Sequence, residues 1–141
     1  MAKEQSAKLT NRHWDKLRDK DYREHFVAAQ IRRFIPFQIR AIMKKRGISQ
    51  TLLAEQSGLT QGVISRVSNP SYGKMTINTI VRIAAGLDMA FIGRFVPFSE
   101  LDRYYRTLSE DAVSDIATFE EEDQLRFGSP GRPWPREEMG P

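Results

Sequence analysis

The stretch that decides the fold runs from Ser49 to Asn69 and reads SQTLLAEQSGLTQGVISRVSN. It predicts two short helices joined by a tight turn. Ser49 is a good N-cap residue, and the residues after it supply the buried side of a first helix: Leu52, Leu53 and Ala54. Gly58 stands where the chain has to turn sharply, which glycine does at little steric cost.

A second helix follows the turn. Thr60 is its predicted N-cap, and an apolar stripe comes after it: Val63, Ile64 and Val67. The other side chains of this helix then face outward, and they are Gln61, Gly62, Ser65 and Arg66. Exposed Gln and Arg near the start of a second helix can read base edges in the major groove of DNA. A plain solvated helix face is the alternative interpretation of the same residues.

The pattern resembles the Cro/lambda-repressor class of helix-turn-helix proteins, also called the XRE family, from about Phe37 to Asp88. Five linked segments carry the resemblance, in order along the chain: the basic helix Gln38–Arg46, the entry Arg46 to Gln50, the core Gln50, Leu53 and Ala54, the turn Ser57 to Thr60, and Ile64 to Arg66. The chain departs from the family in having Ser68-Asn69-Pro70 where Glu-Asn-Gly is usual. It also has Gly62 where Gln or Ser is common, which puts one base contact in doubt.

The resemblance implies an all-α, lambda-repressor-like domain of four to five helices that binds double-stranded DNA. Gln61 and Arg66 would contact base edges, and Gly62 would allow a close approach of the backbone. Phosphate contacts would come from Gln50 and Thr60, which fix position without reading sequence. The full set of candidate DNA-binding residues is Gln50, Thr60, Gln61, Gly62, Ser65, Arg66, Asn69, Tyr72, Lys74, Lys45 and Arg46. For Lys44, Lys45 and Arg46, a phosphate clamp and an ordinary soluble surface remain equally open.

Charge is distributed unevenly along the 141 residues. Residues 1–46 carry 13 Lys and Arg against 5 Asp and Glu, whereas residues 99–141 carry 5 against 11. The basic front half can neutralise phosphates, and the acidic end suggests a second kind of partner. There is no Cys, no apolar run as long as a membrane span, and no apolar segment behind the N-terminus. We therefore expect a cytoplasmic protein.

Enzyme chemistry finds little support in the sequence. The only histidines are His13 and His25, which lie outside the motif and form no recognised metal site. No Gly-rich phosphate loop is present, and no nucleophile stands at a motif spacing from a base. We expect a non-enzyme without cofactor or metal.

Four regions are predicted along the chain. Residues 1–34 form an N-terminal extension that is loosely ordered over 1–20 and helical over 21–34, with Asp21 as cap. Pro36 then breaks or kinks the chain. Residues 35–88 form the helix-turn-helix domain, which ends in a helix capped by Thr76. Residues 89–108 hold a strand and a short helix capped by Ser99, and residues 109–141 form an acidic, Pro/Gly-rich mobile tail.

Residues 89–98 differ from the rest because they are rich in aromatic and β-branched side chains. We predict a strand from about Ala90 to Val96, ended by Pro97. A lone strand leaves its backbone donors and acceptors unpaired, and pairing with a second copy across a two-fold axis would satisfy them. The predicted dimerisation residues are Phe91, Ile92, Arg94, Phe95 and Val96. The alternative is a strand paired, or packed as extended core, within its own chain.

The sequence as a whole predicts a dimeric, sequence-specific transcriptional regulator that represses its own operon. Its operator would be near-palindromic, with half-sites about 34 Å apart. The alternative function is that of an antitoxin, because the layout also resembles HigA-like antitoxins and related prophage regulators. Such a protein would neutralise a toxin through the N-terminal extension or the acidic tail.

Overall fold

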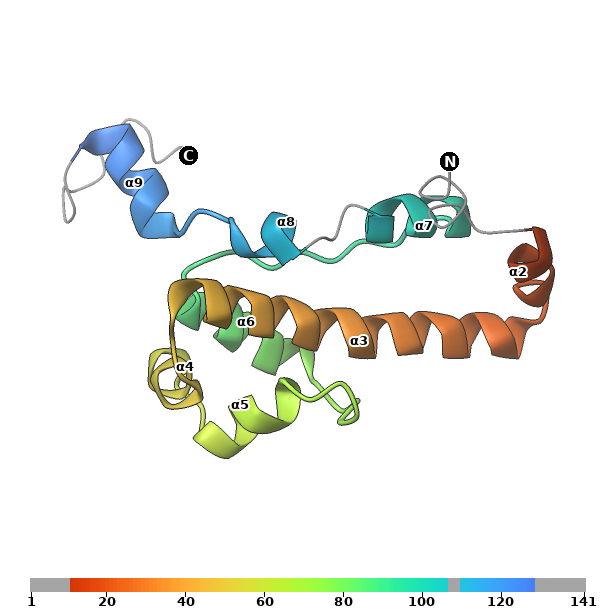
Figure 1. Ribbon diagram of the computed structural model, residues 1–141, viewed down its shortest axis with the longest axis horizontal. Helices are drawn as coiled ribbons and strands as arrows, with labels where there is room; N and C mark the ends of the chain where they lie inside the picture. The colour runs from red at the N-terminus through yellow and green to blue at the C-terminus, as the bar shows by residue number, and fades with distance from the viewer. Residues whose placement is uncertain (1–10, 107–109, 129–141) are drawn as a thin grey trace, which may run out of the picture.

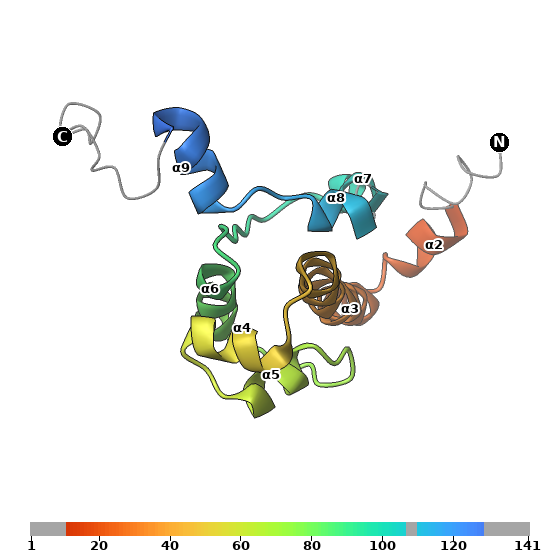
Figure 2. The ribbon, with the colours of Figure 1, turned by 60° about the vertical axis from the view of Figure 1, so that its left-hand side comes forward.

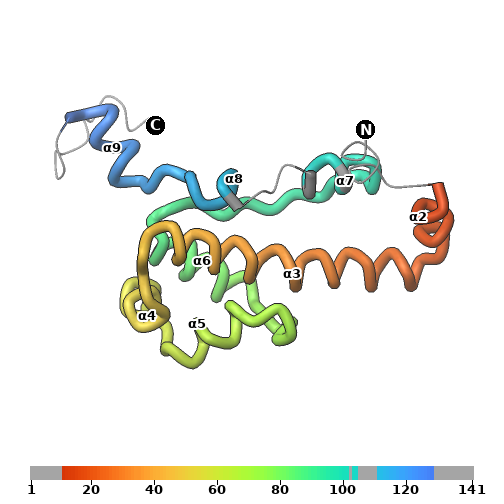
Figure 3. Tube along the Cα trace, viewed as in Figure 1, coloured from red at the N-terminus to blue at the C-terminus, as the bar shows by residue number. Residues whose placement is uncertain are grey.

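The computed structural model describes residues 11–106 and 110–128, and the described part is helical. Its helices are α2 Asn11–Lys16, α3 Lys20–Arg46, α4 Gln50–Ser57, α5 Gln61–Val67, α6 Ile77–Gly86, α7 Phe98–Arg106, α8 Glu110–Ser114 and α9 Phe119–Phe127. The long α3 runs through the middle of the molecule, with α4 and α5 on one side and α7 and α8 on the other (Figures 1 and 2). The tube in Figure 3 shows the chain crossing from one side to the other after α6.

Helix α3 is continuous over 27 residues, about 40 Å, so the predicted break at Pro36 is wrong. A proline inside a helix removes one backbone hydrogen bond and costs about 3 kcal/mol. Here Pro36 is fully buried, and Ile39 and Ile42 in the following turns are buried as well. Burial of these side chains offsets the local cost, and the helix passes through the proline. Its N-cap is Asp19, which accepts from the backbone N–H of Asp21, and not Asp21 itself.

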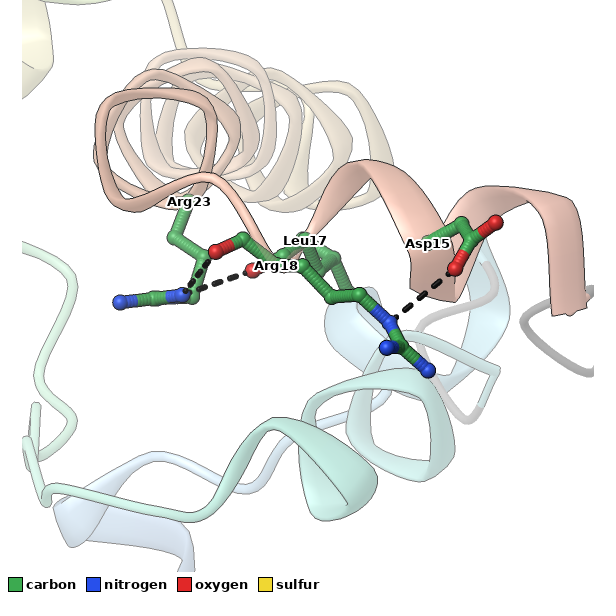
Figure 4. Close-up of polar contacts among 4 residues, drawn as sticks. All are labelled: Asp15, Leu17, Arg18 and Arg23. Carbon is green, nitrogen blue, oxygen red and sulfur yellow. Dashed lines mark hydrogen bonds and ion pairs between the residues drawn. The ribbon is translucent and has the colours of Figure 1, made fainter.

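The stretch before α3 is partly regular, contrary to the prediction of loose order over residues 1–20. Residues 11–16 form α2, while residues 1–10 lie outside the described part. Figure 4 shows how the end of α2 is held: Arg23 Nη1 of α3 donates to the carbonyls of Leu17 at 2.8 Å and Arg18 at 3.1 Å. Arg18 in turn pairs with Asp15 at 3.0 Å. This arrangement ties α2 to the N-terminal end of α3.

The caps and the turn of the helix-turn-helix motif are confirmed. The hydroxyls of Ser49, Thr60 and Thr76 accept from the backbone N–H groups three residues later, at 3.1, 3.2 and 3.2 Å. Gly58 ends α4 in the left-handed region with φ of 66°. Below these caps lies one apolar core, made of Ile39, Ile42, Met43, Leu53, Ala54, Ile64, Val67, Ile83 and Leu87. Leu53 and Ile64 are completely buried. The core joins α3, α4, α5 and α6 into one globule.

Helices α4 and α6 approach each other closely at Gly86. A Cβ atom at this position would lie 2.2 Å from Ser57 Oγ and 3.0 Å from the Ser57 backbone nitrogen. The first distance is shorter than a real contact and the second is tighter than most, so a side chain at position 86 would force Ser57 or one of the two helices to shift. The close approach brings the end of α4, and with it the turn, against α6.

The described residues contain no β-strand, so the strand predicted over 90–96 is not observed. Residues 90–97 run without regular hydrogen bonding between α6 and α7, because no second strand of the described chain lies alongside them. Ile92 is 85% exposed and Phe95 is fully exposed. Arg94 pairs with Glu100 at 2.9 Å. Pairing across a dimer is therefore a separate hypothesis, treated below as a proposal.

After α6 the chain continues along the other side of α3 through α7, α8 and α9 (Figure 1). Helix α7 begins at Phe98, so Ser99 lies inside it and does not cap it. Helices α8 and α9 were not expected from the acidic composition. Val113 of α8 is buried, and the Asp88 carboxylate accepts from the backbone N–H of Glu120 at 3.0 Å, at the start of α9. No helix within the described ranges combines the length and apolar character needed to cross a membrane.

Candidate nucleic-acid interface

Helix α5 presents the polar face that the sequence predicts. Its buried side consists of Ile64 and Val67, which enter the core. The side chains of Gln61, Ser65 and Arg66 are exposed on the opposite side. The helix is held at its start by Thr60, so these groups stand on a capped and packed element. The backbone that carries these side chains therefore loses little freedom when the helix contacts a ligand.

Gln61 and Gln50 are brought together across the turn. Gln61 Nε2 donates to Gln50 Oε1 at 2.8 Å, and the two residues begin α5 and α4 respectively. The bond orients both amides. It leaves one N–H of Gln61 and its carbonyl oxygen for other partners, because an amide side chain carries two donors and an acceptor with two lone pairs. The pair can therefore present a donor and an acceptor side by side, as recognition of adenine in the major groove requires.

Gly62 lies next to Arg66 on the same helix. A Cβ built on Gly62 would stand 3.5 Å from Arg66 Nη1 and 3.9 Å from Thr60 Oγ1, which are ordinary van der Waals distances. The guanidinium of Arg66 is thus folded back over the glycine. Within the described residues, the space beside Gly62 could therefore take a Cβ atom.

The loop after α5 contains three predicted site residues in different surroundings. Asn69 Oδ1 accepts from the backbone N–H of Ser71 at 2.9 Å, so this side chain shapes the loop. Tyr72 is half-buried and packs against the core. Lys74 is exposed. Of the three, only Lys74 offers a charged group to solvent, while the other two position the loop that carries it.

Lys45 and Arg46 lie apart from α5. Lys45 Nζ pairs with Asp115 Oδ1 at 3.3 Å. Arg46 donates to the carbonyl oxygens of Leu87 and Ile116. Helix α8 and the residues after it are on the opposite side of α3 from α5 (Figures 1 and 2). The structure therefore joins these two basic residues to the C-terminal segment and not to the polar face of α5.

The middle of the chain is almost free of acidic residues. Between His25 and Leu87 there are nine Lys and Arg, and Glu55 is the only carboxylate side chain. A stretch of this composition favours the approach of the phosphate backbone wherever its basic residues are unpaired. Arg32 of α3, which is not among the predicted site residues, lies against Gly73 in the loop after α5. No local pattern could have revealed this contact, because the two residues are far apart in the sequence.

The described part of the chain offers no candidate metal site. No group of three His, Asp or Glu side chains gathers there in a way that could hold a metal ion. The polar face of α5 is exposed, so its side chains are available to a ligand.

Comparison with known proteins agrees with the geometry. Residues 38–92 match the family model described as the Cro/C1-type HTH DNA-binding domain. The matched region begins in the second half of α3 and includes α4, α5 and α6. No curated protein and no solved structure gave a significant match.

Proposed function

We propose that this chain, an XRE-like helix-turn-helix protein, is a transcriptional regulator that binds a specific operator as a dimer and represses its own operon. Its Cro/C1-type domain supports DNA binding and regulation as the general activity. One observation carries the sequence-specific part of the proposal: α5 is packed and capped, and it exposes Gln61, Ser65 and Arg66 in a region with a single carboxylate.

Recognition would proceed through α5 in the major groove. Arg66 is suited to a bidentate contact with guanine, and Gln61 to one with adenine. The bond between Gln61 and Gln50 holds the first amide in position before DNA arrives. Gly62 would let the helix backbone come close to the groove wall. Thr60 and Lys74 would bind phosphates and set the register.

The direct test is binding to the DNA upstream of the protein's own gene. Fluorescence anisotropy would be measured with this DNA and with random DNA of equal length, at several salt concentrations. We expect tight binding to a near-palindromic site that resists random competitor. Equal affinity for both DNAs, falling equally with salt, would reduce the function to non-specific phosphate binding.

Arg66→Ala should weaken operator binding by about 1–3 kcal/mol and relax the preference at one base position. The reason is that a base-reading side chain contributes only on the correct base. Lys74→Ala is the control, since loss of a phosphate contact should weaken operator and random DNA alike. Equal losses on the two DNAs for Arg66→Ala would contradict the base-reading role.

Dimerisation through residues 89–98 remains our proposal for the assembly. It is supported by the exposure of Ile92 and Phe95 on a segment whose backbone has no ladder partner in the described chain. A second copy could cover both the side chains and the backbone groups. A two-fold dimer would also place two α5 helices for the two half-sites of a near-palindrome.

Phe95→Asp should convert the dimer into a monomer in sedimentation velocity, because a buried carboxylate at the pairing segment would be unpaired. Ile77→Asp serves as the control, since Ile77 is also strongly exposed, at 80%, but lies in α6. We expect this control to remain dimeric. A Phe95→Asp variant that stays dimeric would exclude the segment as the interface.

An antitoxin role is the second candidate. It is favoured by apolar side chains that are exposed outside the matched domain, such as Ile31 of α3 at 46% and Leu125 of α9 at 86%. Co-expression with the product of an adjacent gene for a small basic protein would test it. A stable complex that relieves toxicity supports the role, and the absence of any complex counts against it. A cytoplasmic location is part of both proposals.

A further inference from the structure

The loop after α5 is held against α3 by one arginine. Gly73 has φ of 66°, and a Cβ there would lie 2.7 Å from Arg32 Cδ and 3.5 Å from Arg32 Cγ. The stem of Arg32 therefore lies flat on the backbone of the loop, in space that only a glycine leaves open. Its guanidinium nitrogen Nη1 comes within 3.8 Å of the same position. The side chain is thus oriented toward the loop that follows the DNA-reading helix.

The charge of Arg32 is not neutralised within the described chain. Arg32 is exposed and makes no hydrogen bond or ion pair with any described residue. Its neighbours one helical turn away on α3 carry no charge, and they are Ala28, Ala29, Ile35 and Pro36. Lys74, next to Gly73 in the loop, is also exposed. Arg32 therefore lies against the residue next to Lys74, and neither cation makes an ion pair among the described residues.

The neighbouring Arg33 provides a contrast. Its guanidinium carbon lies 5.0 Å from the centre of the Phe34 ring, and Nη2 donates to Gln30 Oε1 at 3.1 Å. Arg33 is thus engaged along α3, whereas Arg32 reaches across to the loop. The loop lies on the α5 side of α3, as Figures 1 and 2 show.

We propose that Arg32, together with Lys74, binds a DNA phosphate beside the groove that α5 occupies. Arg32 precedes the matched domain, so the contact would extend the interface beyond residues 38–92. It rests on the proposed DNA-binding function. The fit is chemical, because an arginine whose stem is already packed gives up little freedom when its planar guanidinium meets a phosphate. Such a contact adds affinity on any sequence and increases the dependence of binding on salt.

The test compares Arg32→Gln with Arg33→Gln in the full chain. Glutamine keeps part of the stem over Gly73 and removes the charge, so the loop can stay packed. Anisotropy with operator and random DNA would be followed from low to moderate salt. For Arg32→Gln we expect a loss of about threefold to tenfold on both DNAs and a salt slope smaller by about 0.9. Arg33→Gln should keep the slope of the unchanged chain.

A further variant separates charge from packing. Arg32→Lys retains a cation on a flexible stem, so it should restore the salt slope. If Arg32→Gln keeps the same slope as Arg33→Gln, the phosphate contact is refuted even though the protein binds DNA. If the unchanged chain shows no salt-dependent DNA binding at all, the proposed DNA-binding function is rejected, and the phosphate contact is rejected as a consequence.

Discussion

Replacing Ile64 with alanine should lower the free energy of unfolding by about 2–5 kcal/mol. Ile64 is completely buried in α5 and belongs to the apolar core that joins the helices of the domain. Truncation removes buried methyl groups and leaves a cavity that a close-packed core fills only in part. Since domains of this size are stable by about 5–15 kcal/mol in total, the loss is a large share.

Chemical denaturation followed by circular dichroism would measure this change. Ile77→Ala is the matched control, because Ile77 is 80% exposed and its truncation should stay within about 0.5 kcal/mol. DNA binding by Ile64→Ala should fall with the folded fraction, although the residue faces away from DNA. Equal effects of the two substitutions would contradict the core position of Ile64.

Gly86→Ala should destabilise the domain by about 1–3 kcal/mol, although alanine favours helix by about 1 kcal/mol over glycine. The added methyl group would stand 2.2 Å from Ser57 Oγ and 3.0 Å from the Ser57 backbone nitrogen. The hydroxyl could rotate away, but the backbone could not, so α4 and α6 would have to separate. Gly62→Ala is the control, because a Cβ there meets nothing closer than 3.5 Å. We expect this control to raise the thermal midpoint.

A double substitution tests the cause of the Gly86 effect. Ser57→Ala removes the nearest atom and a buried hydroxyl that has no hydrogen-bond partner in the described chain. The Ser57→Ala/Gly86→Ala pair should therefore be less destabilised than the sum of the two single changes. Strict additivity would show that the clash with the hydroxyl does not matter. Stabilisation by Gly86→Ala alone would contradict the close approach itself.

The helix-turn-helix could be predicted from the sequence because its signals are local. Ser49, Thr60 and Thr76 cap helices without any long-range contact. Each hydroxyl accepts from a backbone N–H only three residues ahead. Gly58 adopts a left-handed conformation that depends mainly on its own lack of a side chain. The outward face of α5 follows from the spacing of its apolar residues. These local features were enough to predict the polar face of α5 and to show the resemblance to a known family.

The rest depended on contacts between distant parts of the chain. Pro36 predicts a break because a proline inside a helix removes a backbone hydrogen bond. The side chain of Pro36 is buried, and α3 stays continuous. The apolar run near Phe95 predicts a strand, yet a strand exists only beside a partner, and the described chain supplies none.

The sequence by itself determined the caps, the turn and the polar face of α5, because these depend on residues within one or two helical turns. Only the tertiary structure decided that Lys45 forms an ion pair with Asp115 and that Gly86 lies close to Ser57 of α4. The same holds for the contact of Arg32 with the loop after α5. Each of these depends on where separate helices meet, and that is settled by the packing of the whole core. Local propensities carry no information about it.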